Sequence, residues 1–205
     1  MRKMTERRRA LIAAGKVPRL PSEYQEVEWI QTDGSSIFEW DGIPGYVPYF
    51  ESKLYSPAQG EWVGLSFGRN VNNAVYIGSV STNNPVFRVK NSQNPASLVS
   101  TISVYSPATQ KYSADGWYIN DVLLGSDYNV SVLPTKVLIG AKWPTLAYYQ
   151  VRFFYMNTYA SDGTPLMSLV PCYRKSDGVK GIYDMIGGTF NTGGSNNNYV
   201  VGPDV

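Results

Sequence analysis

The stretch Tyr148-Tyr-Gln-Val-Arg-Phe-Phe-Tyr-Met-Asn157 contains the pattern that decides the fold. Two sets of residues alternate within it: Tyr149, Val151, Phe153 and Tyr155 in one set, and Gln150, Arg152 and Phe154 in the other. A period of two residues is typical of a β-strand whose two faces meet different surroundings. We therefore predict a strand over residues 148–157, with the two sets on opposite faces.

A similar pattern continues through residues 20–205, where short runs of strand-forming residues are separated by Gly, Pro, Asn, Asp and Ser. Turn signals recur about every 8–12 residues, which is typical of an antiparallel sandwich. No amphipathic helix pattern follows Gly15. The other predicted strands are Val27–Gln31, Ile37–Trp40, Tyr49–Tyr55, Glu61–Phe67, Ala74–Val80, Val86–Lys90, Leu98–Tyr105, Trp117–Leu124, Lys136–Gly140, Pro165–Val170, Gly181–Met185 and Tyr199–Val201. We expect an all-β fold in which two antiparallel sheets form a sandwich.

Two tight hairpins are predicted from their turn residues. Asn120-Asp121 lies between two apolar triplets, and both residue types tolerate the positive φ of a primed turn. Ser161-Asp162-Gly163-Thr164 contains an Asp-Gly reversal. Gly187–Asn198 is rich in Gly and Asn and is expected to form a polar loop before a last short strand.

The charge of the chain is unevenly distributed. Residues 1–19 contain seven basic residues and one acid, which gives a net charge of 7 − 1 = +6. The remaining residues contain 18 − 7 = 11 basic and 16 − 1 = 15 acidic residues, a net charge of −4. Such asymmetry is typical of an interaction tail joined to a folded body. We therefore divide the chain into an arm, residues 1–19, and a domain, residues 20–205.

The arm is predicted to contain a short helix that begins near Thr5 and ends at Gly15. A helix of this length is marginal alone in water, so it should become ordered on a partner. Its anchoring residues are predicted to be Arg7, Arg8, Arg9, Leu11 and Ile12. A secretory signal is disfavoured because the apolar run Ala10–Ala14 is too short. Nucleic-acid binding is disfavoured because few aromatic residues accompany the arm's charge.

Composition excludes several kinds of chemistry. The chain has no histidine and one cysteine, Cys172, so Ser-His-Asp and Cys-His catalysis and Cys/His zinc sites are impossible. No apolar run is long enough to cross a bilayer. These features favour a binding or structural protein over an enzyme, and give no reason to expect a membrane partner.

The most distinctive block of the sequence is Val170-Pro-Cys-Tyr-Arg-Lys-Ser-Asp-Gly-Val179, followed by Gly181-Ile-Tyr-Asp184 and Gly202-Pro-Asp204. It closely resembles a signature of concanavalin A-like (laminin-G-like) jelly-roll domains, in the version found in phage and prophage structural proteins of gut bacteria. The segment Leu20–Ile30 resembles the opening strand of that family, Lys136–Ala141 its buried strand and Trp117–Leu124 its central hairpin. The resemblance implies a two-sheet jelly-roll sandwich. Residues 41–115 match only loosely.

Within this block we expect a fold-specifying role without a ligand. Pro171 and Cys172 are predicted to end a strand, and residues 176–178 to form a turn. The side chains of Tyr173 and Tyr183 are predicted to pack in the core, and Cys172 to behave as a small buried hydrophobe. Arg174 and Lys175 are expected to pair with Asp184 and neighbouring acids.

Catalysis would have to depend on carboxylates. Jelly-roll glucanases use two closely spaced carboxylates, one as nucleophile and one as acid/base. Glu26 with Glu28, and Glu39 with Asp41, are the closely spaced pairs in this chain. Neither pair matches the glucanase pattern of three acids on one strand, so we expect surface charges and no enzyme.

Two kinds of ligand remain. Lectin-like domains often bind calcium, for which Asp121, Asp127 and Asn129 are candidate ligands, although their spacing matches no known loop and we expect no metal or other cofactor to be required. Glycans stack on aromatic rings and hydrogen-bond to amide groups, and the chain has 5 Trp and 16 Tyr. The candidate glycan-binding residues are Tyr76, Trp117, Asn120 and Trp143.

These observations predict a non-enzymatic phage virion protein, made in the host cytoplasm and exposed on the particle surface at the head, tail or baseplate. Its partners would be virion proteins bound through the arm and host or mucosal glycans bound by the lectin-like domain, with a homo-oligomer as an open option. The alternatives are a bacterial carbohydrate-binding module without particle attachment and a β-glycan hydrolase. All three assignments follow from the resemblance, because a fold alone does not determine a function.

Overall fold

The computed structural model describes residues 19–42, 49–57, 62–70, 73–79, 86–91, 94–126, 136–142, 147–194 and 198–205. In these ranges every regular element is a β-strand. The predicted helix of the arm falls on residues 5–15 and lies outside them.

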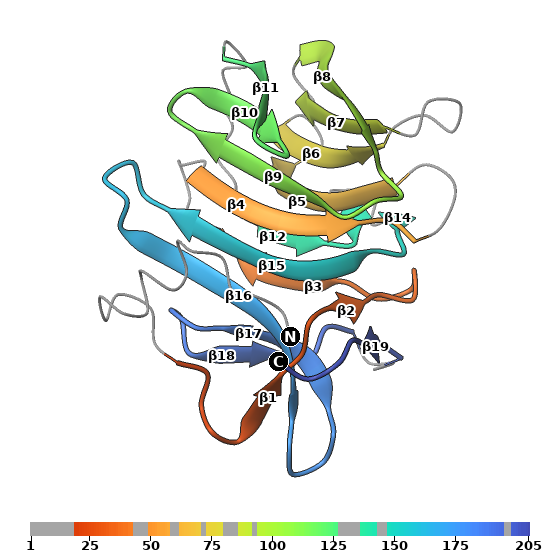
Figure 1. Ribbon diagram of the computed structural model, residues 1–205, viewed down its shortest axis with the longest axis vertical. Coiled ribbons are helices and arrows are strands. Elements are labelled where there is room, and N and C mark those ends of the chain that lie inside the picture. Colours follow the sequence, from red (N-terminus) through yellow and green to blue (C-terminus); the bar gives the residue numbers. More distant parts are fainter. Residues whose placement is uncertain are drawn as a thin grey trace.

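The larger of two main sheets contains eleven strands (Figure 1). Eight follow the order β11-β10-β9-β4-β15-β16-β17-β18, while β1 pairs with β16, β2 with β15, and β19 with β2. Their bounds are β1 Tyr24–Glu26, β2 Ile30–Gln31, β4 Tyr49–Tyr55, β9 Ala108–Ser113, β10 Gly116–Ile119, β11 Val122–Gly125, β15 Arg152–Tyr159, β16 Pro165–Arg174, β17 Lys180–Asp184, β18 Thr189–Asn191 and β19 Val200–Val201.

The smaller sheet contains six strands in the order β3-β12-β5-β6-β7-β8. Their bounds are β3 Phe38–Asp41, β5 Trp62–Asn70, β6 Asn73–Ser79, β7 Val86–Asn91, β8 Asn94–Ser103 and β12 Lys136–Ile139. A separate pair, β13 Ala141–Lys142 and β14 Ala147–Tyr148, contacts β5 through β13. All of the pairings between these strands are antiparallel.

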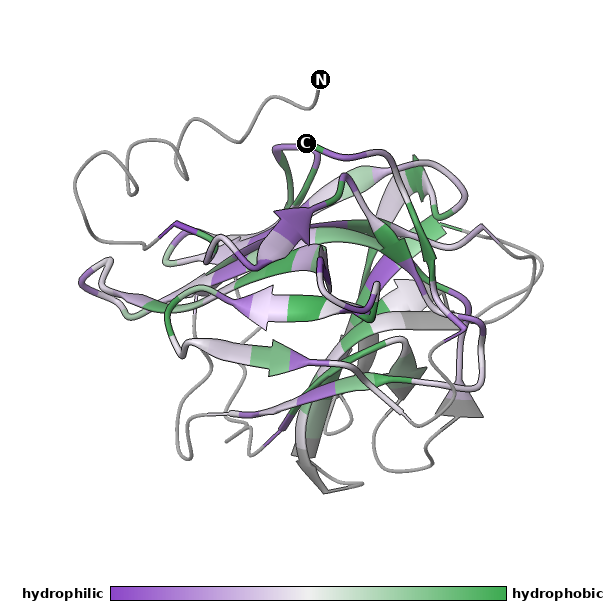
Figure 2. Ribbon diagram, turned by 90° about the horizontal axis from the view of Figure 1, so that it is seen from below, coloured by the Kyte–Doolittle hydropathy of each residue, from purple (hydrophilic) through white to green (hydrophobic). Residues whose placement is uncertain are grey.

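One apolar core joins the two sheets into a sandwich. The large sheet contributes Phe50, Leu54 and Phe153, and the small sheet contributes Phe67 and Phe87, all nearly inaccessible to solvent. In Figure 2, hydrophobic and hydrophilic segments alternate along the strands, as expected when one face of each sheet meets the core. The prediction of an all-β, two-sheet antiparallel sandwich is confirmed.

The strand predicted over residues 148–157 is observed as β15 over Arg152–Tyr159, with Tyr148 in β14, and the predicted alternation is interrupted by a bulge. In the pairing of β15 with β4, Phe153 lies opposite Leu54, and the next pair of opposite residues is Tyr155 with Lys53. Phe154 is the additional residue, so Tyr155 points away from the core with Lys53 and does not share the face of Phe153. The prediction that Phe153 and Tyr155 share a face was therefore wrong, because a bulge changes the face of every residue that follows it.

A second, smaller apolar cluster lies on the side of the large sheet that faces away from the main core. Val170, Cys172, Tyr183 and Met185 are buried there, and Leu20, Tyr24, Ile186 and Phe190 pack against them. The ring centroid of Tyr24 lies 4.9 Å from that of Tyr183 and 4.8 Å from that of Phe190. Leu20 belongs to this cluster, so the beginning of the domain is held against the sheet.

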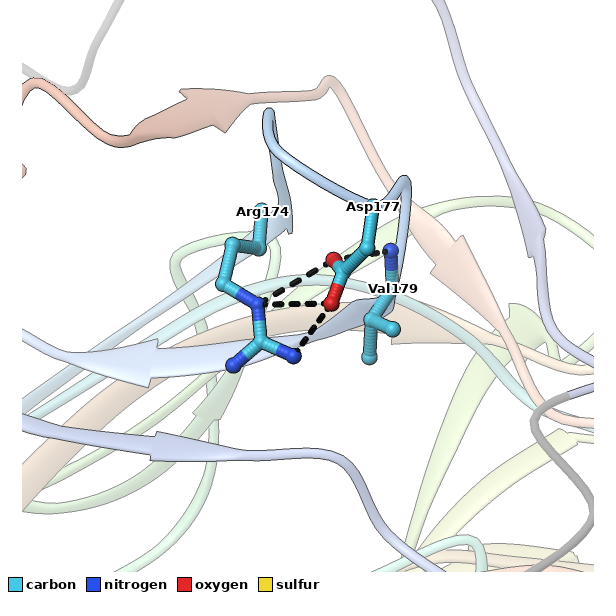
Figure 3. A network of polar contacts seen from close by, with 3 residues as sticks. All are labelled: Arg174, Asp177 and Val179. Atoms are coloured by element: carbon cyan, nitrogen blue, oxygen red, sulfur yellow. Dashed lines mark hydrogen bonds and ion pairs between the residues drawn. The ribbon is translucent and has the colours of Figure 1, made fainter.

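The signature block is continuous with this cluster. β16 continues through Cys172 to Arg174, so the prediction that Pro171 and Cys172 end a strand was wrong; pairing with β1 and β17 extends it. The turn predicted at residues 176–178 forms one residue earlier, at 175–177, and Gly178 follows it with φ +70°. Arg174 forms an ion pair with Asp177, whose Oδ1 also accepts from the backbone of Val179 at 3.1 Å (Figure 3).

Three other predictions for this block need correction. Arg174 pairs with Asp177 and not with Asp184, whose Oδ1 accepts from the backbone N–H groups of Ser168 (3.1 Å) and Ile186 (3.0 Å). Lys175 donates from Nζ to the carbonyl of Ser22 at 2.8 Å, which ties the turn to the start of the domain. Tyr173 is only half-buried, because its hydroxyl donates to Asp204 Oδ2 at 3.3 Å near the surface, while Tyr183 is buried as predicted.

The strands that the sequence failed to predict are β1, β9, β13, β14 and β18. β1, β13, β14 and β18 have two or three residues each, too few for a period to be recognised. β9, Ala-Thr-Gln-Lys-Tyr-Ser, does alternate, but its inward residue Gln110 is polar. Gln110 is satisfied inside the sandwich, because its Nε2 donates to the carbonyl of Ala108 at 2.8 Å and its Oε1 accepts from Ser52 at 3.0 Å.

Both predicted hairpins are confirmed. Asn120 (φ 49°) and Asp121 (φ 63°) are the two non-glycine residues with positive φ in the described ranges, and they connect β10 to β11. Two left-handed residues in succession are the signature of a type I′ turn. In the second hairpin Gly163 has φ +84°, and the backbone of Ala160 donates to the carbonyl of Thr164 at 2.8 Å.

The turn between β10 and β11 gives a stability prediction. Replacing Asn120 with Ala places a side chain that disfavours positive φ in the turn and removes the acceptor for the backbone N–H of Thr109, 2.8 Å away. We expect a loss of about 1–2 kcal/mol in the free energy of unfolding, measured by urea denaturation. Asp121→Gly, which keeps the turn, is the matched variant and should lose no stability. Equal losses in both variants would contradict this assignment of the turn.

Candidate functional site

The four residues predicted to bind glycans do not form a common surface. Tyr76 and Trp117 are 6% and 1% exposed. Trp117 stacks on Tyr112 with ring centroids 4.5 Å apart, inside the main core. Trp117 enters the main core, while Tyr76 lies on the other face of the small sheet, in a separate cluster with Ala74 and Tyr149. Neither ring is exposed to a ligand, so the prediction that both form an exposed platform was wrong.

The other predicted residues have different outcomes. Asn120 is exposed, but its position in the β10–β11 turn and its bond to Thr109 explain why an Asn is present there. Trp143 lies outside the described residues, as do the anchoring residues Arg7, Arg8, Arg9, Leu11 and Ile12. Those assignments stay predictions.

The carboxylate pairs have structural partners. Glu39 and Asp41 share one face of β3, as predicted, and both bind Lys136 of the neighbouring strand β12, at 2.6 Å and 3.1 Å from its Nζ. Hydrogen bonds to these two carboxylates raise the pKa of Lys136. Glu26 lies in β1 opposite Cys172, and the backbone of Glu28 donates to the carbonyl of Pro203 at 2.8 Å.

The predicted calcium ligands are not brought together in the part of the chain that is described. Asp121 is exposed in its turn, and Asp127 and Asn129 lie outside the described ranges. Within those ranges no group of three or more Cys, Asp or Glu side chains is placed to hold a metal ion. The same residues contain no helix that is long and apolar enough to span a membrane.

The surface with the strongest binding chemistry is the side of the large sheet that faces away from the core. The side chains of β4 alternate, with Phe50, Ser52 and Leu54 buried and the intervening residues partly exposed. Around them, β2, β9, β10 and β15 place further aromatic and charged residues on the same side. We call this surface the outer face; it comprises Trp29, Gln31, Glu51, Lys53, Tyr55, Lys111, Tyr118, Arg152, Phe154 and Tyr155.

Arg152 is the most firmly held cation of the outer face. Its guanidinium lies 3.9 Å from the ring centroid of Trp29 and 5.3 Å from that of Tyr55. Its Nε and Nη2 donate to Gln31 Oε1 at 3.1 Å and 2.7 Å. These contacts fix the guanidinium plane while the side chain stays partly exposed, which is a suitable arrangement for binding an anion or a hydroxyl group.

Two lysines of the outer face also lie over rings. Lys53 Nζ is 4.9 Å from the ring centroid of Phe154, and Lys111 Nζ is 5.1 Å from that of Tyr118. Tyr155 donates from its hydroxyl to Glu51 Oε1 at 2.7 Å. Phe154 and Tyr155 are buried, 6% and 5% exposed, so the ring that is partly exposed in this group is that of Tyr118.

The outer face was not predicted from the sequence, because the type of a residue does not show on which side of a sheet its side chain lies. The alternation of Tyr49–Tyr55 was visible, and it places Glu51, Lys53 and Tyr55 on one side. The missing information was the pairing of this strand with β9 and β15, which are distant in sequence. The sequence signal that could have indicated this surface is the occurrence, in several strands, of charged and aromatic residues at alternate positions.

Comparison with known protein-family models and with curated proteins finds no match for this sequence. The resemblance to concanavalin A-like domains therefore stays a hypothesis that depends on the sequence blocks quoted above.

The single cysteine gives a prediction about reactivity. Burial, with a smaller contribution from the nearby Glu26 carboxylate, raises the pKa of the Cys172 thiol to about 12. Because the folded protein favours the neutral thiol, this preference stabilises the fold fully below about pH 9 and is lost as the pH rises toward 12. Only the thiolate reacts with alkylating reagents.

We therefore expect iodoacetamide at pH 8 to leave Cys172 unmodified in the native protein and to modify it in urea, as measured by intact mass. Cys172→Ala is the control that identifies the labelled site. Equal rates of labelling with and without urea would contradict the burial of the thiol.

Proposed function

We propose that this protein is a non-enzymatic structural protein of a phage particle, exposed on the particle surface and attached through residues 1–19. In this proposal its domain is a lectin-like jelly roll that binds host or mucosal glycans. The observation that carries the binding function is the outer face, where the rings of Trp29, Tyr55 and Tyr118 are partly exposed beside fixed hydrogen-bond donors. Sugar rings pack on aromatic surfaces, and their hydroxyl groups bind such donors.

The order of the strands supports the jelly-roll part of the proposal. The chain passes from the small sheet (β3) to the large sheet (β4), returns for β5–β8, crosses again for β9–β11, and then enters β12 before it ends in the large sheet. Repeated crossing between two sheets is typical of jelly rolls. The resemblance of residues 170–184 to phage-borne domains of this class points the same way.

The beginning of the domain supports attachment through the arm. Leu20 packs in the second apolar cluster, and Lys175 binds the chain at Ser22 through Nζ and at Glu23 through its backbone N–H. A segment of net charge +6 therefore starts from a fixed point on the domain. A fixed starting point lets a bound arm determine where the domain sits on a particle.

Glycan binding is tested with a glycan array and the full-length protein. Tyr55→Ala and Tyr118→Ala should each weaken binding to the glycans that score on the array by about tenfold, the effect of losing about 1.4 kcal/mol. Tyr148→Ala is the matched control, because Tyr148 is 43% exposed but belongs to β14, outside the large sheet. An array without any bound glycan would refute the binding function, and release of reducing sugar that depends on Glu26, Glu28 or Glu39 would favour a hydrolase.

Attachment is tested by whether the protein purifies with phage particles. Deletion of residues 1–19, or neutralisation of Arg7, Arg8 and Arg9, should release the protein from particles and leave the thermal unfolding of the domain unchanged. Neutralising Lys53 and Lys111, which lie on the outer face of the domain, is the control and should preserve association. Particle binding that survives deletion of the arm would contradict attachment through it and favour a free carbohydrate-binding module.

A further inference from the structure

Three cations of the outer face form a diagonal row across adjacent strands. Arg152 on β15 lies opposite Tyr55 on β4, and Lys53 follows two residues away on the same side of β4. Lys53 lies opposite Thr109 on β9, and Lys111 is again two residues further along that strand. Diagonal neighbours in antiparallel sheets are about 7–8 Å apart, so the row spans about 15 Å.

Each cation of the row lies over an aromatic ring. Arg152 contacts Trp29 and Tyr55, Lys53 contacts Phe154, and Lys111 contacts Tyr118, as described above. A ring beneath a cation is attracted to it and restricts its motion. All three cations are partly exposed.

The local charge of the row is opposite to that of the domain. Strands β4, β9, β10 and β15 contain one acidic residue, Glu51, against the three cations, which gives a local net charge of +2. The domain as a whole carries −4. The single carboxylate of Glu51 also accepts from Tyr155, which holds it in place. This positive strip on an acidic domain is therefore a local feature and not a consequence of overall composition.

We infer that the row formed by Arg152, Lys53 and Lys111 binds acidic glycans, with carboxylate or sulfate groups at the cations and sugar rings on the partly exposed rings of Trp29, Tyr55 and Tyr118. This inference deepens the proposed glycan-binding function and depends on it. Nucleic acid fits less well, since its phosphates are dense, about one charge per 1.7 Å of duplex, and three cations on a negative domain neutralise few of them. A sparsely charged sugar polymer matches a row with widely spaced cations.

The experiment measures binding of the full-length protein by calorimetry to matched pairs of ligands. The pairs are polygalacturonate with its methyl ester, and 3′-sialyllactose with lactose. We expect each acidic member to bind at least about tenfold more tightly than its neutral partner, and this preference to decrease with added salt. Equal binding of both members would overturn the inference and leave the proposed function intact, whereas no binding of any glycan here or on the array would refute both.

Variants then assign the preference to the row. The combined variant Lys53→Gln, Lys111→Gln, Arg152→Gln should lose the preference. The charge-conserving variant Lys53→Arg, Lys111→Arg, which leaves the stacked guanidinium of Arg152 in place, should keep it within about threefold. Lys136→Gln, on the small sheet, is the matched control. Thermal unfolding of each variant shows that it is folded; if the Gln variant does not fold, single Lys111→Gln and Arg152→Gln variants replace it.

The basic arm is an alternative source of anion binding, and the experiment distinguishes it. Neutralising Arg7, Arg8 and Arg9 should leave the preference for acidic glycans unchanged. If that variant loses the preference for acidic glycans while the combined Gln variant of the row keeps it, the inference is overturned. Single-stranded DNA that competes with polygalacturonate at equal concentration, in a manner that depends on the row, would assign the row to nucleic acid and also overturn it.

Discussion

The pairing of β15 with its neighbours is the constraint on which the rest of the structure depends. One edge of β15 pairs with β4, while the other pairs with β2 near Arg152 and with β16 from Met156 onward. One strand therefore aligns two early segments of the chain, β2 and β4, with β16, the strand that follows it. Because the bulge at Phe154 occurs within this strand, it determines which side chains enter the core and which reach the outer face.

The bulge also explains why the outer face is aromatic. Without it, Tyr155 would share the face of Phe153 and enter the sandwich. With it, Phe154 and Tyr155 both lie outside the main core, where they contact Lys53 and Glu51. One additional residue thus places two buried rings on the outer side of the sheet, where they support Lys53 and Glu51, at the cost of a local interruption in the ladder.

The sequence was sufficient to predict the class of fold and most strands, because alternation and turn residues are local properties. Asn120-Asp121 is an example, since the requirement for positive φ at both positions can be read from two residues. The position of the site could not be predicted this way. Trp117 was expected on a surface because of its residue type, but its burial depends on the pairing of β10 with β9 and on the rings of Phe50 and Tyr112.

The last residues of the chain lie beside the first residues of the domain. Gly202 donates from its backbone to the carbonyl of Trp29, Val205 donates to that of Glu26, and Asp204 forms a bridge with Val27. Figure 1 shows the C-terminal end beside β1. Any segment joined after Val205, such as an affinity tag or a fluorescent protein, would therefore emerge beside the end of β1, so labels that must leave this part of the domain free are better placed in the exposed turn at Ser161 and Asp162.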